Sequence, residues 1–143
     1  QWFAKDLFGE SDVEETQMIY ENIQAQAMLV LKYLADNNGL ILFGTDTPSG
    51  PIYGNQPGYN GYWELKLMKE AGVSLHRILA SATINNAKAF HLDASIGSLA
   101  IGKKANLIIM TKNPLIEIEA YDALEKVVIG GEVITREDLE VKE

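Results

Sequence analysis

The sequence predicts an α/β fold, with an α/β half at residues 1–91 followed by a small antiparallel β half at residues 92–143. A long amphipathic helical stretch leads through glycine into the apolar run Leu40–Phe43, which has the length of a buried strand. Such a strand is typical of a parallel sheet in an α/β protein. From about Leu92 onward, short apolar runs alternate with turn residues, which is typical of β structure.

The first helix is expected to begin after Ser11 and to end near Asn37. Ser11 followed by Glu14 forms a capping box. Apolar residues then recur at three- and four-residue steps and predict one apolar face. The face consists of Ile19, Ile23, Ala27, Val30, Leu31 and Leu34. We expect Gly39 to adopt the left-handed conformation that ends the helix.

The segment Thr47–Gly61 is rich in proline, glycine and tyrosine and predicts a long irregular loop. A loop of this length is usually functional or disordered, so a lid, a pocket wall and an ordinary surface connection all stay open. Three helices should follow: Tyr62–Ala71 with Gly72 as its stop, a helix capped by Ser74, and Ile84–Phe90 capped by Thr83.

The β half is expected to contain four strands joined by short turns. The strands are predicted at residues 98–101, 105–110, 126–129 and 132–135. Gly130-Gly131 between two apolar runs indicates a two-residue hairpin turn. The tail, residues 136–143, is charged and should be solvated or loosely helical.

Composition excludes several classes of partner. The chain has 143 residues and a net charge of −8, with 20 acids against 12 bases, which argues against nucleic acid or an anionic membrane as the main partner. There is no cysteine, hence no disulfide and no thiolate metal site. No apolar stretch approaches the ~18 residues of a membrane span, and no signal peptide is visible. Because the first residue is Gln1, we expect a processed product or a piece of a longer protein.

Asp46 is the sharpest candidate for chemistry, because it follows the apolar run almost directly. Catalytic residues of α/β proteins lie just beyond the carboxyl ends of strands. An aspartate at such a place is also a common turn residue, and position alone leaves both roles open. His76 and His91 form no site with Asp46 by spacing, and Ser49 lacks an obvious base. No H-x-H, H-E-x-x-H or cysteine pair is present, so this chain alone predicts no full metal site.

Several motifs, taken in order, carry a resemblance to a known family. They are Phe43-Gly44-Thr45-Asp46, Glu64-Leu65, Ala71-Gly72-Val73-Ser74, Ala82-Thr83-Ile84-Asn85-Asn86-Ala87, the run Ile96–Ile109, Asn113-Pro114-Leu115 and Val127–Gly131. Their order and spacing resemble the end of a metal-dependent amidohydrolase. The resemblance looks closest to the imidazolonepropionase-like and Xaa-Pro dipeptidase (prolidase)-like branch and covers about residues 12–136. One departure is Asn106, where the family usually has aspartate at a structural position.

The resemblance implies the C-terminal portion of a (β/α)8 hydrolase barrel plus part of a small β-sandwich, because a whole barrel needs roughly 250 residues. Leu40–Thr45 would be the eighth strand. Asp46 would be both catalytic and a metal ligand, accepting the proton of a metal-activated water and passing it to the leaving amine. The expected cofactor is a divalent metal, zinc by preference, as one or two ions whose other ligands lie outside this chain.

The resemblance also implies a small amide or peptide substrate, which is dipeptide-like, with the Xaa-Pro type among the candidates. Tyr53, Tyr59 and Asn60 in the predicted loop would contact it. The expected partners are the remaining N-terminal part of the same enzyme and further copies in a homo-oligomer. The alternative is a non-catalytic remnant that acts as a structural or binding module, self-associating or held by a partner chain. The compartment stays open, with the cytoplasm favoured over the periplasm or secretion.

Overall fold

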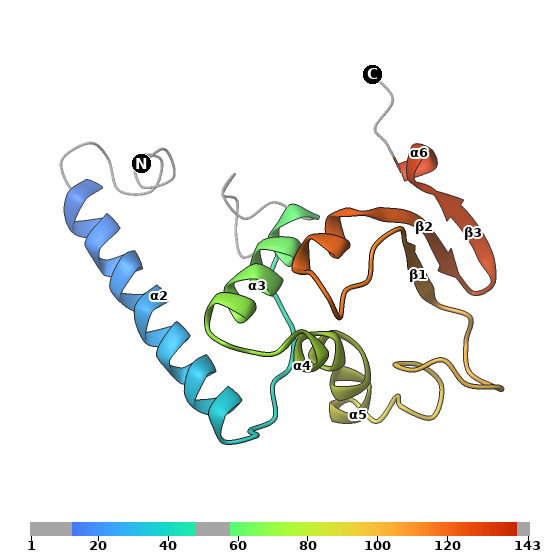
Figure 1. Cartoon of the computed structure of the whole chain (residues 1–143), viewed down its shortest axis with the longest axis horizontal. Helices are drawn as coiled ribbons and strands as arrows, with labels where there is room; N and C mark the ends of the chain where they lie inside the picture. The colour runs from blue at the N-terminus through green and yellow to red at the C-terminus, as the bar shows by residue number, and fades with distance from the viewer. Residues whose placement is uncertain (1–12, 48–57, 140–143) are drawn as a thin grey trace. The chain divides into compact units, whose positions relative to one another are not determined.

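The computed structural model describes residues 13–47 and 58–139, which contain helices and one three-stranded antiparallel sheet (Figure 1). Two compact units are present. The first comprises the described residues up to Gly39 together with Gly44–Val73, and the second comprises Leu40–Phe43 with the residues from Ser74 onward. The units are defined by which residues contact one another, and they do not test the predicted domain boundary between residues 91 and 92, which stays a prediction. None of the helices in the described ranges has both the length and the apolar character needed to cross a membrane.

Helix α2 (Val13–Asp36) confirms the first predicted helix, but its end differs in detail. The left-handed residue is Asn38, with φ 53°, and not Gly39. The N–H of Gly39 donates to the carbonyl of Leu34 at 2.8 Å, which closes the helix in the manner of a Schellman motif. A Cβ at Gly39 would lie 2.6 Å from Cδ2 of Leu34. A larger residue at position 39 would crowd the Leu34 side chain, while Asn38 adopts the left-handed turn.

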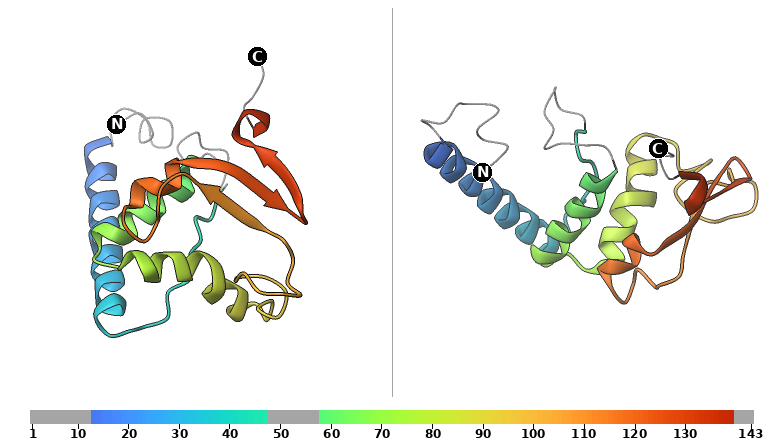
Figure 2. Two further views of the ribbon diagram at one scale, coloured as in Figure 1. Left: turned by 45° about the vertical axis from the view of Figure 1, so that its right-hand side comes forward. Right: turned by 90° about the horizontal axis from the view of Figure 1, so that it is seen from above.

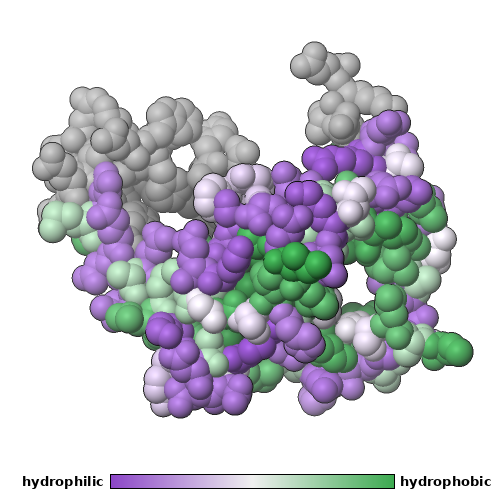
Figure 3. Space-filling view, viewed as in Figure 1, coloured by the Kyte–Doolittle hydropathy of each residue, from purple (hydrophilic) through white to green (hydrophobic). Residues whose placement is uncertain are grey.

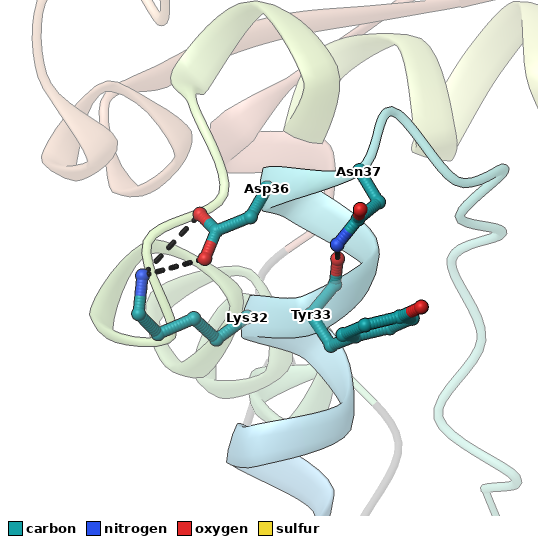
Figure 4. Close-up of polar contacts among 4 residues, drawn as sticks. All are labelled: Lys32, Tyr33, Asp36 and Asn37. Carbon is teal, nitrogen blue, oxygen red and sulfur yellow. Dashed lines mark hydrogen bonds and ion pairs between the residues drawn. The ribbon is translucent and has the colours of Figure 1, made fainter.

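The last turn of α2 is also held by side chains (Figure 4). The Asn37 amide Nδ2 donates to the carbonyl of Tyr33 at 2.9 Å. Lys32 and Asp36 form an ion pair at 2.9 Å, one helical turn apart, with both side chains more than half exposed. An exposed pair of this kind contributes at most about 1 kcal/mol, so the backbone closure at Gly39 is the stronger stop signal.

The apolar face predicted for α2 is mostly exposed. Ile19, Ile23 and Val30 are all more than half exposed. Two other members of the predicted face, Leu31 and Leu34, are half-buried, and so is Met28. An amphipathic helix normally buries such a stripe against a neighbour. The described part of the first unit leaves it uncovered, and we call Ile19, Ile23 and Val30 the α2 stripe.

Helix α3 (Tyr59–Glu70) supplies the core of the first unit. Leu65 and Met68 are buried, as predicted, and Gly72 has a φ of 90° just beyond the helix end. The helix starts three residues earlier than the predicted Tyr62. Tyr59 and Asn60 therefore lie in its first turn and not in the loop.

The second unit contains one continuous helical rod, drawn yellow-green in Figure 2. It runs through α4 (Leu75–Ala80), the π-helical turn η2 (Ser81–Asn85) and α5 (Asn86–Ala89). Ser74 caps it as predicted, accepting from the N–H of Arg77 at 3.4 Å. The predicted second helix start at Thr83 is wrong, because the Thr83 hydroxyl donates to the carbonyl of Leu79 inside the rod. Phe90, at the end of the rod, is 70% exposed.

The segment Leu40–Thr45 forms no strand in the structure, which corrects the predicted strand. Burial nevertheless alternates along it: Ile41 is 6% exposed, whereas Leu40 and Leu42 are 67% and 44% exposed. Alternation with a period of two is the burial pattern of a strand. A strand also needs a ladder with a neighbour, and in the described residues this segment is hydrogen-bonded to the helical rod instead.

The sheet has the order β1-β2-β3 with antiparallel pairing throughout. Its strands are β1 (Leu107–Met110), β2 (Leu124–Ile129) and β3 (Glu132–Thr135). The predicted Gly130-Gly131 hairpin is confirmed, and its residues have φ angles of 60° and 92°, which suits a primed two-residue turn. Asn106 Oδ1 accepts from the N–H of Gly130 at 2.8 Å, so this departure from the family pattern serves the hairpin.

The predicted strand at residues 98–101 is wrong. This stretch lies in a loop of bends and turns, and Leu99 and Ile101 are almost fully exposed. The ammonium group of Lys103 organises the loop by donating to the carbonyl of Ile96 and to Ser98 Oγ.

The short 3₁₀ turn η3 (Ile118–Asp122) buries Ile118 and Ala120. The helix α6 (Arg136–Leu139) confirms that the charged tail begins in helical conformation.

Candidate functional site

Asp46 lies at the surface, at the end of the alternating segment. Its φ of 50° places it in the left-handed region. This conformation costs an ordinary L-residue about 1–2 kcal/mol, and aspartate is among the few that adopt it readily. Strained backbone positions of this kind cluster at functional sites. The geometry therefore suits a presented carboxylate, while the catalytic role of Asp46 stays a prediction.

Asn60 lies next to the segment that carries Asp46. Its amide Nδ2 donates to Oγ1 of Thr47 at 2.9 Å, and the Thr47 hydroxyl lies 3.4 Å from the carbonyl of Thr45. The first turn of α3 is thereby tied to the residues on both sides of Asp46. Of the residues predicted to contact substrate, Asn60 is the one that the structure brings to this segment. Thr47, which sequence reasoning did not single out, provides the link.

Tyr59 belongs to an aromatic cluster on α3. Its ring meets those of Tyr62 and Trp63 edge-on, with centroids 5.7 Å and 5.8 Å apart. The ammonium group of Lys66 lies 4.7 Å from the Trp63 ring and 5.5 Å from the Tyr62 ring. Cation–π contacts of this kind help to hold a partly exposed cluster together. Tyr53, the remaining predicted substrate contact, lies outside the described residues.

Glu64 is a half-buried carboxyl group on α3, in its second turn. It is too far from the helix start to offset the helix dipole, because the helix begins at Tyr59 and has no acid in its first turn. Burial raises the pKa of the Glu64 carboxyl above its usual value. Within residues 13–47 and 58–139, no hydrogen bond or ion pair compensates this desolvation.

Glu64→Gln should stabilise the chain at neutral pH. Because the pKa of Glu64 is higher in the folded state, the folded state binds more protons just above pH 4.5, and stability falls as pH rises through that window. We expect the melting temperature to rise by about 1–3 °C at pH 7, a small effect because the side chain is partly exposed. The gain should vanish below pH 4.5, where Glu64 is protonated in both states.

The matched control for this experiment is Glu132→Gln, which neutralises an exposed carboxylate on β3. Melting temperatures measured from pH 4 to 8 should show a pH-dependent gain for the Glu64 variant alone. Equal pH profiles for the two variants would show that burial of Glu64 has no thermodynamic effect.

The described residues do not form a metal site by themselves. Nowhere in residues 13–47 and 58–139 do three histidine, aspartate or glutamate side chains come together. Metal sites in proteins require about three or four ligands. Asp46 could supply one carboxylate, and the remaining ligands must come from elsewhere.

A cleft of about 850 Å³ lies entirely within the second unit, between the helical rod and the sheet. It is lined mainly by apolar side chains such as Leu79, Phe90, Leu107 and Met110. Two buried polar atoms at its wall, Asn86 Oδ1 and the Tyr121 hydroxyl, have no hydrogen-bond partner in the described structure. Figure 3 shows hydrophobic side chains gathered at the surface in the region of the sheet. We refer to this feature as the rod–sheet cleft.

A sequence model described as the amidohydrolase family matches residues 12–134, which is most of the chain. The chain belongs to the amidohydrolase family. Membership implies a (β/α)8 hydrolase-type fold, and the mixture of helices with a small sheet is consistent with part of such a fold. The family is generally metal-dependent. The predicted resemblance to this family is thus confirmed.

Three solved structures illustrate this relationship. A Xaa-Pro dipeptidase with methionine bound in its active site is 26% identical, with a TM-score of 0.68 over 78% of this chain and 26% of its own. A Bifidobacterium longum protein described as a prolidase is 29% identical, with a TM-score of 0.73 over 92% of this chain and 31% of its own. An amidohydrolase from Thermotoga maritima MSB8, at 24% identity and a TM-score of 0.58, covers 76% of this chain and 26% of its own and supports the fold alone.

These amidohydrolases are much longer than the chain, which spans 26% to 31% of their length. Among curated proteins, none matches the chain. Two features of the described residues are consistent with this short coverage. They contain no group of three potential metal ligands, and segments with strand-like character, such as Leu40–Thr45, have no neighbouring strand there.

Proposed function

We propose that this chain is the C-terminal part of a metal-dependent amidohydrolase that cleaves an amide or peptide bond in a small substrate. The observation that carries the proposal is the family match over residues 12–134, combined with the exposed, left-handed Asp46 at the end of a strand-like segment. The similarity to structures named Xaa-Pro dipeptidase and prolidase favours a dipeptide-like substrate of the Xaa-Pro type. By itself, the chain should be inactive.

In this proposal Asp46 moves one proton. Its carboxylate accepts a proton from the attacking water, whose oxygen bonds to the carbonyl carbon of the substrate. The carbon–nitrogen bond then breaks, and the same proton passes from Asp46 to the leaving amine. Asp46 would hold the divalent metal together with further ligands outside this chain. The metal is expected to be zinc, as one or two ions. When bound it would lower the pKa of water towards ~7.

Substrate contacts would come from the first turn of α3 and the loop before it. Asn60 is tied to Thr47 beside Asp46, which supports its assignment to the substrate side of the site. Tyr59 presents a partly exposed ring from the aromatic cluster, suited to a proline or another apolar side chain. Tyr53 is retained as a third candidate from the sequence alone.

The partner in this proposal is the N-terminal part of the same enzyme, and this chain joined to it is called the complete enzyme below. Three surfaces of the chain support such a partner: the α2 stripe, the rod–sheet cleft and the outer edge at Leu42. The backbone of Leu42 makes no hydrogen bond within the described structure, although the residues on either side do. Open edges and exposed apolar faces favour association. We also propose that the protein forms a homo-oligomer and resides in the cytoplasm. Both proposals rest on the sequence alone.

The substrate class can be tested with a panel of dipeptides incubated with the complete enzyme and zinc. We expect Xaa-Pro dipeptides to be hydrolysed at higher kcat/KM than Xaa-Ala dipeptides with the same first residue. An inverted preference would remove the Xaa-Pro assignment. If the complete enzyme hydrolysed neither dipeptides nor other amides, the enzymatic proposal itself would be wrong.

A non-catalytic remnant is the second candidate function. The observations that favour it are the absence of a three-ligand cluster in the described residues and the apolar rod–sheet cleft with its two unsatisfied polar atoms. Mass spectrometry of the native sample separates the two. A second, histidine-rich chain would support the enzyme, whereas a stable oligomer of the 143-residue chain alone would support a structural or binding module.

A further inference from the structure

Two adjacent asparagines hold the backbone that leads to Asp46. The Asn85 amide Nδ2 donates to the carbonyl of Ile41 at 3.1 Å, and the Asn86 Nδ2 donates to the carbonyl of Phe43 at 2.8 Å. The N–H of Phe43 completes the set by donating to the carbonyl of Ser81 at 3.3 Å. All of these groups lie within the second unit.

The pattern of these bonds is that of one strand edge. In extended backbone, the polar groups of residues i and i+2 point to the same side, and a neighbouring strand normally binds them. Here the bonded residues are Ile41 and Phe43, which are also those whose side chains are buried or half-buried. Two side-chain amides and one carbonyl of the helical rod thus occupy the place of a neighbouring strand.

The π-helical turn explains why the rod can do this. An ordinary α-helix uses each carbonyl for its own N–H groups four residues on. In η2 (Ser81–Asn85) this register changes to π-helical, and the carbonyl of Ser81 accepts a hydrogen bond from the N–H of Phe43, outside the rod. The Ser81 side chain is fully buried and donates to the carbonyl of Ile78 at 2.7 Å, which fixes the start of the turn. Single π-helical turns of this kind are frequent at functional sites.

We propose that Asn85 and Asn86 are positioning residues for Asp46. They fix the backbone of residues 41–43 in the second unit, and Asp46 follows Phe43 by only three residues along the chain, so they anchor the stretch of backbone from which Asp46 continues. This inference rests on the proposed function of Asp46. It adds that side-chain amides of the helical rod anchor the backbone leading to Asp46, in the place where a sheet ladder would hold a strand.

Asn85→Asp and Asn86→Asp in the complete enzyme test the proposal, because each keeps the side-chain shape and removes the amide donor. The matched control is Asn37→Asp, which removes the similar side-chain bond from Asn37 Nδ2 to the carbonyl of Tyr33 at the end of α2. Asn85→Ala and Asn86→Ala serve as second variants, since they add no charge. The readouts are kcat, KM and amide hydrogen exchange over residues 41–46.

We expect kcat to fall by about 10- to 100-fold in the Asn85 and Asn86 variants, with KM changed by less than about 3-fold, because small displacements of a catalytic group act mainly on turnover. Amide exchange over residues 41–46 should accelerate about 10-fold as the local opening free energy falls. The Asn37 control should change neither quantity. Unchanged exchange in residues 41–46 in both the aspartate and the alanine variants would overturn the proposal, and so would unchanged kcat with faster exchange.

The failure of this proposal can be told apart from the failure of the proposed function. If Asp46→Asn leaves turnover intact, Asp46 is not the proton carrier. Faster exchange in the Asn85 and Asn86 variants would then show that they hold the segment, but not that they position a catalytic group, and the positioning proposal would fall with the function. If Asp46→Asn abolishes turnover and the asparagine variants have wild-type kcat, only the positioning proposal fails.

Discussion

Replacing Asp46 with asparagine is expected to lower the turnover number of the complete enzyme by about 100-fold or more, the usual contribution of a general base. The substitution keeps the size of the side chain and removes its ability to take up a proton. Asparagine also tolerates the left-handed backbone at this position, so the fold should be preserved. The measurement is steady-state hydrolysis with zinc supplied in excess.

The control for this experiment is Asp36→Asn, which removes an exposed acid at the end of α2 from its ion pair with Lys32. We expect its kcat to match the wild type. If the Asp46 variant also retains activity within about 3-fold of the wild type, a general-base role is ruled out, since such a role contributes far more.

Gly97→Ala is expected to destabilise the second unit by about 2–5 kcal/mol, as the sum of a left-handed backbone and an overpacked contact. Gly97 has a φ of +84°, and a Cβ there would lie 2.5 Å from the Cβ of Ala87. It would also meet backbone atoms of Ile84 and Thr83, at 3.2 Å and 3.3 Å. Because these atoms belong to the helical rod, neither side can move away cheaply.

Gly102→Ala is the matched control, because Gly102 has a φ of +89° and no atom within 4 Å of the added Cβ. It should show only the backbone cost, about 1–2 kcal/mol. Urea unfolding followed by circular dichroism measures both values. Equal destabilisation of the two variants would show that the contact between residue 97 and the helical rod is not tight in solution.

Elements whose signals are local could be predicted from the sequence. Helix α2 follows from its periodicity, Ser74 caps α4 through its own hydroxyl, and Gly130-Gly131 makes the hairpin from two residues that favour positive φ. The end of α2 was misassigned by one residue, because asparagine and glycine are both common at the left-handed position. The structure shows that Asn38 has the positive φ angle and that Gly39 lies close against Leu34.

Elements that depend on distant partners could not be predicted in the same way. Apolar composition marked residues 40–43 and 98–101 as strands, but a strand exists only with a neighbour to complete its ladder. For residues 41–43 the partners are Asn85 and Asn86, which lie more than forty residues away in sequence. Side-chain amides carry no periodic signal that would reveal such a contact.

The candidate site was predictable in part. The abrupt end of an apolar run pointed to Asp46, and the family match now places the chain among amidohydrolases. The link from Asn60 to Thr47 and the burial of Glu64 depend on where α3 begins, and the sequence placed that start three residues too late. The further metal ligands of the proposed site are not predictable from this chain, which spans less than a third of the length of the three structures described above.

The decisive measurement for a hydrolytic site shared between this chain and an N-terminal part is dipeptide hydrolysis with the metal removed and returned. The complete enzyme and the 143-residue chain alone are assayed side by side, each untreated, stripped with a chelator, and resupplied with zinc. We expect turnover only by the complete enzyme, lost on chelation and restored by zinc. Comparable turnover by the 143-residue chain alone, or full activity of the stripped enzyme, would contradict a shared metal-dependent site.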